Sequence, residues 1–162
     1  MPGAKTAYLS IGSNLGDRAR NLVTAMELLA GPGLRVTRRS SVYETEPQDL
    51  RAQPWFLNQV VEVETTLFPR QLLARIHKVE SAMGRRRLVD KGPRTIDIDI
   101  VLYGSFAMES PDLVIPHPRM ADRRFVLEPL MELNPDLRHP GTGESIRQML
   151  GRVGSQSVRR MM

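Results

Sequence analysis

The chain has 162 residues, which predicts one domain that spans residues 1–162 and has its own hydrophobic core. It has no cysteine, no signal-peptide pattern and no run of about 18 apolar residues, so we expect a cytoplasmic protein without disulfides, thiolate metal sites or a membrane span. The net charge is +5, and among the 23 basic residues only Lys5, Lys78 and Lys91 are lysines. The excess of arginine predicts an anionic partner, either a nucleic acid or a small polyphosphate.

The first half of the chain predicts a strand, a helix and two further strands. Residues 7–11 are mostly apolar and predict a buried strand. Apolar residues at helical spacing follow, and a Gly-Pro-Gly sequence at 31–33 ends that helix. Alternation of polar and apolar residues then predicts strands over 34–44 and 57–67.

The second half predicts a helix that Pro69 opens, a basic loop over 84–93, and a strand after that loop. The order up to this point is β-α-β-β-α-β, which is the order of a ferredoxin-like fold. We therefore expect an α+β domain whose antiparallel or mixed sheet is covered by helices. The remaining elements are a short strand and two extra C-terminal helices, at 113–115, 119–133 and 144–153. The tail over 151–162 is expected to be disordered.

The most informative segment is the sequence GPRTIDIDIVL at residues 92–102. It predicts a strand in which Asp97 and Asp99 share one face while isoleucines fill the other. Carboxylates at this spacing lie about 6.5 Å apart along a strand and repel each other, so a cation between them is favoured if they face a cleft. Mg²⁺ shared with a substrate phosphate fits such oxygen ligands, with Arg94 beside them. The alternative is a half-buried strand with two acids on its outer face.

No backbone cradle for phosphate is evident. The sequence contains neither a Walker motif nor a G-x-G-x-x-G loop after a strand. Phosphate would then be bound by Mg²⁺ and by arginines of the basic loop, such as Arg85 and Arg87, with Arg123 further along. The alternative interpretation of these arginines is a solvated face or a nucleic-acid patch.

Four segments in this order resemble the 6-hydroxymethyl-7,8-dihydropterin pyrophosphokinase family of folate biosynthesis. They are AYLSIGSNLGDR at 7–18, QPWFLN at 53–58, GPRTIDIDIVLYG at 92–104, and IPHPRM at 115–120 followed by Arg123 and Phe125. The similarity extends from about Tyr8 to Leu150. The tail from residue 151 has no counterpart in the family pattern.

The resemblance implies an ATP-dependent pyrophosphokinase that transfers pyrophosphate from ATP to the pterin hydroxymethyl oxygen and releases AMP. It implies two Mg²⁺ ions held by Asp97 and Asp99, and catalysis by Arg85 and Arg94, which would stabilise charge on the transferring group. The partners would be ATP and 6-hydroxymethyl-7,8-dihydropterin. We expect a monomer without a membrane or nucleic-acid partner.

The resemblance also implies which residues bind the two substrates. The pterin-binding residues are Thr45, Glu46, Gln48, Phe56, Asn58 and Phe125. The ATP-binding residues are His77, Glu80, Arg87, Ile100, His117 and Arg123. Without the resemblance, the two phenylalanines would be interpreted as core side chains and Asn58 as a strand residue that faces solvent.

Two other functions stay open. An arginine-rich ferredoxin-like sheet could bind RNA, although none of the predicted strands carries the stacking aromatic pattern that such binding requires. A nucleotidyltransferase would also combine a Gly-Ser pair such as Gly12-Ser13 with a D-x-D pair. In that class the two elements lie close in sequence, whereas here most of the predicted core separates them.

Overall fold

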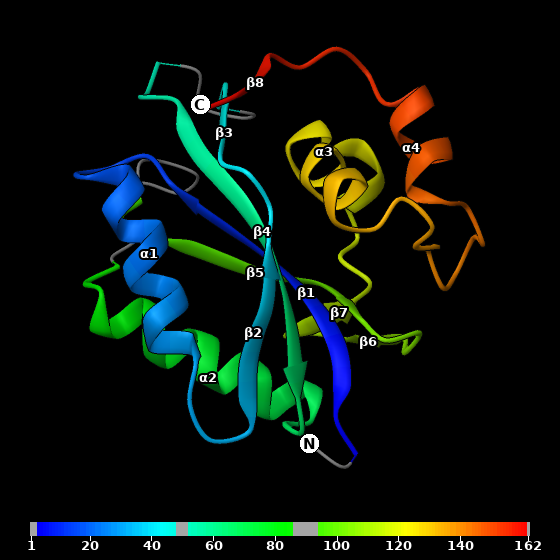
Figure 1. The fold of residues 1–162 in the computed structure, drawn as a ribbon, viewed down its shortest axis with the longest axis horizontal. Helices are drawn as coiled ribbons and strands as arrows, with labels where there is room; N and C mark the ends of the chain where they lie inside the picture. The colour runs from blue at the N-terminus through cyan, green and yellow to red at the C-terminus, as the bar shows by residue number, and fades with distance from the viewer. Residues whose placement is uncertain (1–2, 48–51, 86–93, 162) are drawn as a thin grey trace.

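The computed structural model describes residues 3–47, 52–85 and 94–161. Within these ranges the chain forms an antiparallel sheet with helices on both faces (Figure 1). The expected α+β fold class is confirmed. Gln48 and Arg87, to which the sequence assigns substrate-binding roles, lie outside the described residues.

The sheet is built around β1 (Lys5–Ser13), which pairs antiparallel with β4 (Phe56–Thr65) on one side and with β5 (Asp97–Tyr103) on the other. Both β2 (Leu34–Arg39) and β3 (Tyr43–Thr45) pair with β4, at opposite ends of that long strand. The order β5-β1-β4 followed by β2 and β3 agrees with the ferredoxin-like order expected from the sequence.

The strand predicted over 34–44 is therefore two strands. Between them, Ser40 takes over the pairing with β4, since its N–H donates to the Val60 carbonyl at 2.9 Å and its hydroxyl accepts from the Val60 N–H at 3.0 Å. A side chain that bonds the neighbouring strand in this way interrupts the regular ladder without leaving its polar groups unpaired.

The C-terminal tail differs from the expectation of disorder. Within it, β8 (Val158–Arg160) pairs antiparallel with β3 and becomes the edge of the sheet. The N–H of Met161 donates to the Val42 carbonyl at 2.8 Å. The ordering partner is the open edge of β3, which lies more than a hundred residues earlier in the chain and gives no local signal in the tail.

Two helices cover one face of the sheet. α1 (Arg18–Leu29) begins at Asp17, whose carboxylate accepts from the Arg20 N–H at 3.2 Å, and α2 (Pro69–Ala82) has proline at its first position. Both are the helices that the sequence predicts. None of the described helices is long and apolar enough to cross a membrane.

The other face carries α3 (Arg124–Leu133) and α4 (Ile146–Arg152). The helix predicted from residue 119 starts instead as a 3-10 turn at Met120–Asp122. A hairpin of β6 (Met108–Ser110) and β7 (Leu113–Ile115) precedes it, and β6 is an element that the sequence did not predict.

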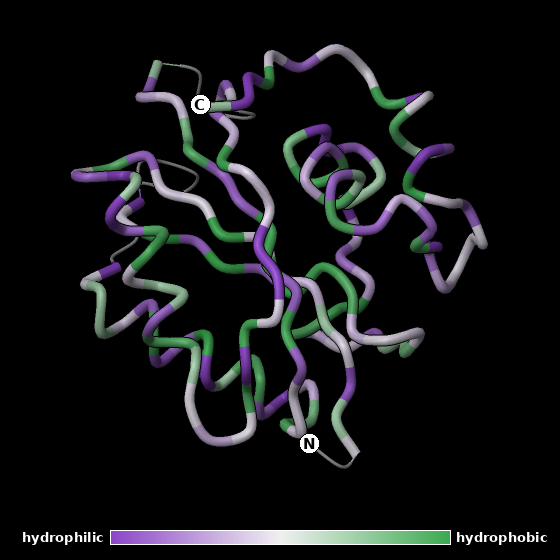
Figure 2. Tube along the Cα trace, in the orientation of Figure 1, coloured by the Kyte–Doolittle hydropathy of each residue, from purple (hydrophilic) through white to green (hydrophobic). Residues whose placement is uncertain are grey.

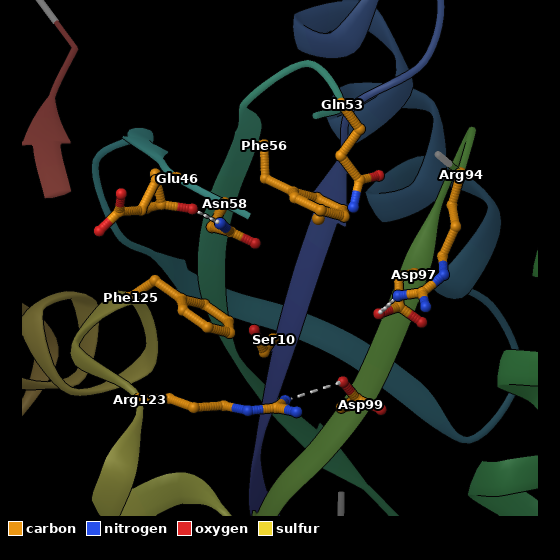
Figure 3. A pocket seen from close by; sticks show the side chains of 12 residues that line it. Ser10, Glu46, Gln53, Phe56, Asn58, Arg94, Asp97, Asp99, Arg123 and Phe125 are labelled. Carbon is orange, nitrogen blue, oxygen red and sulfur yellow. Dashed lines mark hydrogen bonds and ion pairs between the residues drawn. The ribbon is translucent and has the colours of Figure 1, made fainter. Parts of the chain in front are cut away.

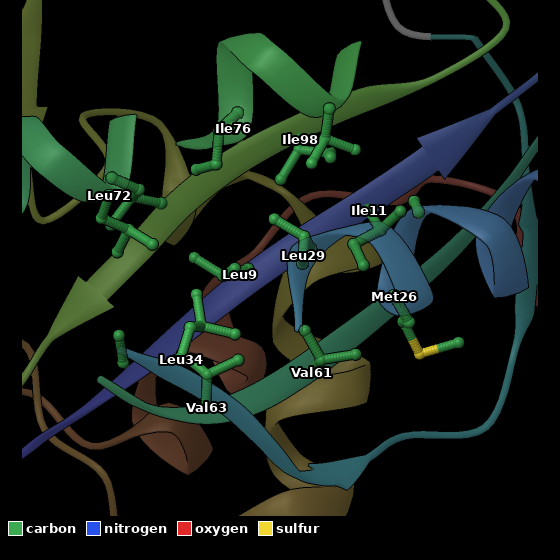
Figure 4. Close-up of a cluster of buried hydrophobic side chains, with 14 of the residues drawn as sticks. Leu9, Ile11, Met26, Leu29, Leu34, Val61, Val63, Leu72, Ile76 and Ile98 are labelled. Atoms are coloured by element: carbon green, nitrogen blue, oxygen red, sulfur yellow. The ribbon is translucent and has the colours of Figure 1, made fainter. Parts of the chain in front are cut away.

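A large apolar cluster fills the space between the sheet and helices α1 and α2 (Figure 4). Its buried members include Leu9, Ile11, Leu22, Val61, Leu72, Ile76, Ile96, Ile98 and Ile100. The isoleucines around the acid pair are among them, so the prediction that they share the face opposite the acids is confirmed.

A second cluster lies between the sheet and helices α3 and α4. It contains Tyr8, Val60, Val101 and Leu102 from the strands and Val126, Leu127, Leu130 and Met149 from the helices. Figure 2 shows hydrophobic and hydrophilic residues interspersed along the same strands, as expected for a sheet with two different faces. This second cluster covers only part of its face.

A β-bulge in β5 separates the polar half of that strand from its apolar half. Relative to β1, the register shifts between Ile100 and Leu102, which leaves Val101 as the extra residue. Val101 and Leu102 both pack into the second cluster. Before the bulge the same face is polar, because it carries Asp97 and Asp99.

Candidate active site

A pocket opens on the α3 face of the sheet, beyond the second apolar cluster (Figure 3). Three neighbouring strands each contribute two side-chain positions two residues apart. These are Ser10 and Gly12 from β1, Phe56 and Asn58 from β4, and Asp97 and Asp99 from β5. Positions two apart share a face, so the floor of the pocket follows from strand period and register.

The walls come from segments beside the sheet. β3 and the residue after it contribute Thr45 and Glu46, and the loop before β4 contributes Gln53. Arg123 and Phe125 stand at the start of α3, where the guanidinium lies 5.4 Å from the centre of the phenyl ring. Such stacking holds a cation over an aromatic face.

One end of the pocket is charged. Asp97 lies between two arginines, with one carboxylate oxygen 3.2 Å from Arg85 Nη1 and the other 3.2 Å from Arg94 Nη1. Asp99 lies 3.9 Å from Arg123 Nη1. Burial and the nearby Asp97 charge raise the pKa of Asp99 above its usual range, against the smaller effect of Arg123. A bound cation would favour the charged form of Asp99.

Arg85 connects this end to a second hollow, which His77, Glu80 and Ser81 line. The buried Glu80 carboxylate accepts from Arg85 Nη1 at 2.5 Å and from the Ile98 N–H at 3.0 Å. Burial raises the pKa of Glu80 even so. The Nε and Nη2 atoms of Arg85 are buried and have no hydrogen-bond partner among the described residues. Buried donors of this kind are typical of an anion-binding side chain.

The other end of the pocket is polar but uncharged. Asn58 is buried, and its Nδ2 donates to the Thr45 hydroxyl at 2.6 Å. Gly12 lies directly against it, since a Cβ there would stand 2.6 Å from Asn58 Oδ1. Only glycine at position 12 leaves enough room for the Asn58 amide in its observed position. Phe56 and Phe125 enter the same region from β4 and α3 (Figure 3).

The pocket thus brings together most of the side chains that the sequence singled out. From the pterin set, it contains Thr45, Glu46, Phe56, Asn58 and Phe125; from the other sets, Arg94, Asp97, Asp99 and Arg123. Arg85, His77 and Glu80 lie in the adjoining hollow. Which ligand each of them binds stays a prediction.

Ile100 and His117 are placed differently. The Ile100 side chain is buried in the α1/α2 cluster, so only its backbone could contact a nucleotide. His117 lies outside both hollows, and its Nδ1 accepts from the Arg119 N–H at 3.1 Å. Burial, and secondarily the charge of Arg123, lowers the pKa of His117 to about 4, so this side chain is neutral at pH 7.

Sequence reasoning did not place Ser10, Gly12 or Gln53 among the substrate-binding residues, yet all three line the pocket. The available signal for Ser10 and Gly12 was alternation, since Leu9 and Ile11 are core residues of the same strand. Alternation places them on one face but does not say that β5 lies beside them, because strand pairing is not a local property.

The acid pair provides only part of a metal site. Among the described residues, no group of three or more His, Cys, Asp or Glu side chains could hold a metal ion. Mg²⁺ commonly binds through one or two carboxylates and takes its other ligands from water and substrate phosphates. Two carboxylates next to an arginine with unpaired buried donors fit that mode of binding.

The fold and the pocket together define a class of protein, an α+β domain whose sheet carries a pocket with an acid pair and arginines suited to bind phosphate groups. The particular family follows from comparison with known proteins. The chain belongs to the 7,8-dihydro-6-hydroxymethylpterin-pyrophosphokinase (HPPK) family, whose model matches residues 8–135.

Two bacterial relatives match over nearly their whole length. Both are named 2-amino-4-hydroxy-6-hydroxymethyldihydropteridine pyrophosphokinase. The protein of Methylorubrum extorquens is 42% identical over 156 residues, which are 96% of this chain and 98% of that protein. The protein of Bacillus subtilis is 42% identical over 151 residues, which are 93% of this chain and 90% of that protein.

Other relatives are much longer. The folic acid synthesis protein of Pneumocystis carinii is 41% identical over 155 residues, which are 96% of this chain but 21% of that protein. The chain therefore spans about a fifth of this relative. Among solved structures, Plasmodium falciparum HPPK-DHPS superimposes with a TM-score of 0.75 at 17% identity, over 92% of this chain and 43% of that one. At this identity the likeness shows the fold alone.

Proposed function

We propose that the protein transfers the pyrophosphoryl group of ATP to the hydroxyl of 6-hydroxymethyl-7,8-dihydropterin, giving AMP and the pterin pyrophosphate of folate biosynthesis. The observation that carries the proposal is a pocket with two unlike ends. An acid pair with arginines lies at one end, and a buried amide with two phenyl rings lies at the other. Family membership and the names of the two full-length bacterial relatives support it.

At the uncharged end, a flat heterocycle fits between Phe56 and Phe125. Asn58 is suited to recognise its edge, because one amide supplies both a donor and an acceptor. The bond to Thr45 fixes the orientation of that amide, and Gly12 gives it room. Glu46 would complete the wall on this side through its backbone, since its carboxylate accepts from the Ser157 N–H at 3.0 Å. Stacking and a fixed hydrogen-bonding edge would therefore both select the pterin.

At the charged end, the three arginines are suited to bind a polyphosphate and to stabilise charge as the pyrophosphoryl group transfers. Arg94 and Arg85 flank Asp97 at equal distances, and Arg85 has buried donors to offer. Arg123 occupies the space between Asp99 and Phe125, so it would contact the phosphate chain close to the pterin. The second hollow, with His77 and Glu80, would accept more of the nucleotide.

Asp97 and Asp99 are the proposed ligands of two Mg²⁺ ions. When bound, Mg²⁺ would supply neutralisation of the triphosphate and a lower pKa for the attacking hydroxyl. The protein's own contribution is to hold both substrates on one rigid sheet, so that the hydroxyl and the phosphate meet without a search. A strong side-chain base is not required in this scheme.

The further ATP contacts remain proposals: His117, and Ile100 through its backbone. A monomeric state and a cytoplasmic location are also part of the proposal. The RNA-binding and nucleotidyltransferase alternatives are not favoured, because the family match accounts for the acid pair and the arginines together.

The test is AMP release from ATP and Mg²⁺, measured with and without 6-hydroxymethyl-7,8-dihydropterin. We expect AMP only when the pterin is present, and no AMP from Asp97→Ala under the same conditions. A folded wild-type protein that releases no AMP would contradict the proposed reaction. Label from the α-phosphate that stays on the acceptor would instead indicate nucleotidyl transfer.

A further inference from the structure

Asn14 lies in the turn between β1 and α1, outside the lining of both hollows, and the residue is 1% exposed. Its Nδ2 donates to Gln53 Oε1 at 2.9 Å and to the Pro54 carbonyl at 3.0 Å. Its Oδ1 accepts from the Arg94 N–H at 2.8 Å, and its own N–H donates to the Arg94 carbonyl at 3.1 Å. One asparagine therefore bonds two segments that are distant from each other in sequence.

Both of these segments end in the pocket. Gln53 lines it and stands just before Phe56, so this segment leads into the uncharged end. Arg94 lines it from the other side and directs its guanidinium to Asp97. Neither Gln53 nor Arg94 belongs to a strand, so the sheet ladder does not hold them. Asn14 instead holds these two segments through its side-chain hydrogen bonds.

We propose that Asn14 is a positioning residue that sets the distance between the two ends of the pocket, by holding the segment before β4 and the backbone of Arg94 on one amide. This inference rests on the proposed function. Only asparagine suits the position, since it needs an acceptor for Arg94 and two donors for the other segment at this length. Asn14 lines neither hollow, so it acts through Arg94 and through Gln53 and Pro54.

The two arms of the amide can be separated by substitution. Asn14→Ala removes both, and we expect kcat to fall about 10- to 100-fold and KM for the pterin to rise, because small displacements of catalytic groups are costly. Asn14→Asp keeps the acceptor for the Arg94 N–H and loses the donors. It should raise KM for the pterin while reducing kcat less than Asn14→Ala does.

The matched control is Asn21→Ala. Asn21 also bonds within this turn, since its Nδ2 donates to Ser13 Oγ at 3.1 Å and to the Leu15 carbonyl at 2.9 Å, but it reaches neither residue 53 nor residue 94. If Asn14 were only a stabiliser of the turn, both alanine variants would lose stability and neither would change kcat or KM of the folded fraction. That result would overturn the proposal.

A double-mutant cycle tests the route through Arg94. In the Arg94→Ala background, Asn14→Ala should lower kcat by much less than it does in the wild type, because the group it positions is gone. Equal effects in both backgrounds would contradict the proposal.

The positioning role can also be tested without measuring turnover, so its failure can be distinguished from failure of the proposed function. Hydrogen exchange of the Arg94 amide should accelerate in Asn14→Ala and stay slow in Asn14→Asp and Asn21→Ala. A wild-type protein with no activity but this exchange pattern would sink the proposed reaction and leave the positioning contact established. An unchanged exchange rate in Asn14→Ala would overturn the positioning role whatever the activity.

Discussion

The two faces of the central sheet are made by the same strands and have opposite chemistry. In β1, Leu9 and Ile11 pack under α1 and α2, while Ser10 and Gly12 between and after them line the pocket. One face is closed by two helices and is apolar. The other is closed by α3 and α4 over only part of its area. A sheet can therefore take its stability from one face and leave part of the other for chemistry.

The two faces also contribute to the free energy of folding with opposite signs. Burial of apolar side chains on the α1/α2 face is the main favourable term for such a domain. On the pocket face, two carboxylates sit close together and the pKa of Asp99 is raised, which means that the surroundings disfavour its charged form. The same strand, β5, thus stabilises the fold through its isoleucines and carries an electrostatic cost at Asp99.

The largest effect expected is on turnover, from the pocket face alone. Asp97→Asn and Asp99→Asn preserve shape and remove one charge each, so kcat should fall by about 1,000-fold or more while thermal stability stays equal or rises. Turnover and thermal unfolding of the same preparations would check this. Unfolding of either variant would mean that the acids are structural and that the contrast between the faces is wrong.

Leu9→Ala on the apolar face should have the opposite result, a loss of stability without a loss of turnover. It should lower the free energy of unfolding by about 3 kcal/mol, because Leu9 is fully buried and a cavity would remain. Activity per folded molecule should change little. Leu28→Ala is the control, since that leucine of α1 is 44% exposed. Denaturant unfolding that showed equal losses for both variants would count against the buried face as the source of stability.

Gly12→Ala tests how tightly Gly12 packs against Asn58 on the pocket face. The added Cβ would meet Asn58 Oδ1, so the amide must move and pterin affinity should fall about 10- to 100-fold. ATP affinity should be retained, because the charged end is not touched. Calorimetry of both ligands would check this, and Gly154→Ala, where a Cβ meets no atom within 4 Å and φ is not positive, controls for the loss of a glycine as such. Equal loss of both affinities would indicate a general distortion.

The smallest effect expected concerns His117. Its pKa is about 4 in the folded protein against 6.5 in the unfolded chain, so the unfolded state binds the proton more readily. The stability that neutral His117 contributes is complete above pH 6.5 and is lost as the pH falls toward 4, by about 2 kcal/mol at pH 5.

The comparison of wild type with His117→Gln isolates this contribution from that of Asp99, whose raised pKa acts in the opposite direction. The difference between the two unfolding free energies should shrink as the pH falls from 7 to 4. A difference that stays constant over this range would show that His117 does not titrate as its burial indicates.

Much of the fold is readable from the sequence because it follows from local patterns. The helices α1 and α2 were predicted from apolar spacing, a proline start and a Gly-Pro-Gly stop. The short elements were not, since β6 and β8 have three residues each and exist only through their pairing partners. The division of 34–44 into two strands likewise depends on the bond between Ser40 and Val60.

The sequence by itself determined that Asp97 and Asp99 share a face opposite the isoleucines, because a strand repeats every two residues whatever surrounds it. The resemblance to a family then proposed roles for them and for the arginines. Only the tertiary structure decided that Ser10, Gly12 and Asn58 lie beside the acids and that Asn14 joins two distant segments. These depend on strand register and loop contacts, which are set by burial across the whole chain rather than by neighbouring residues.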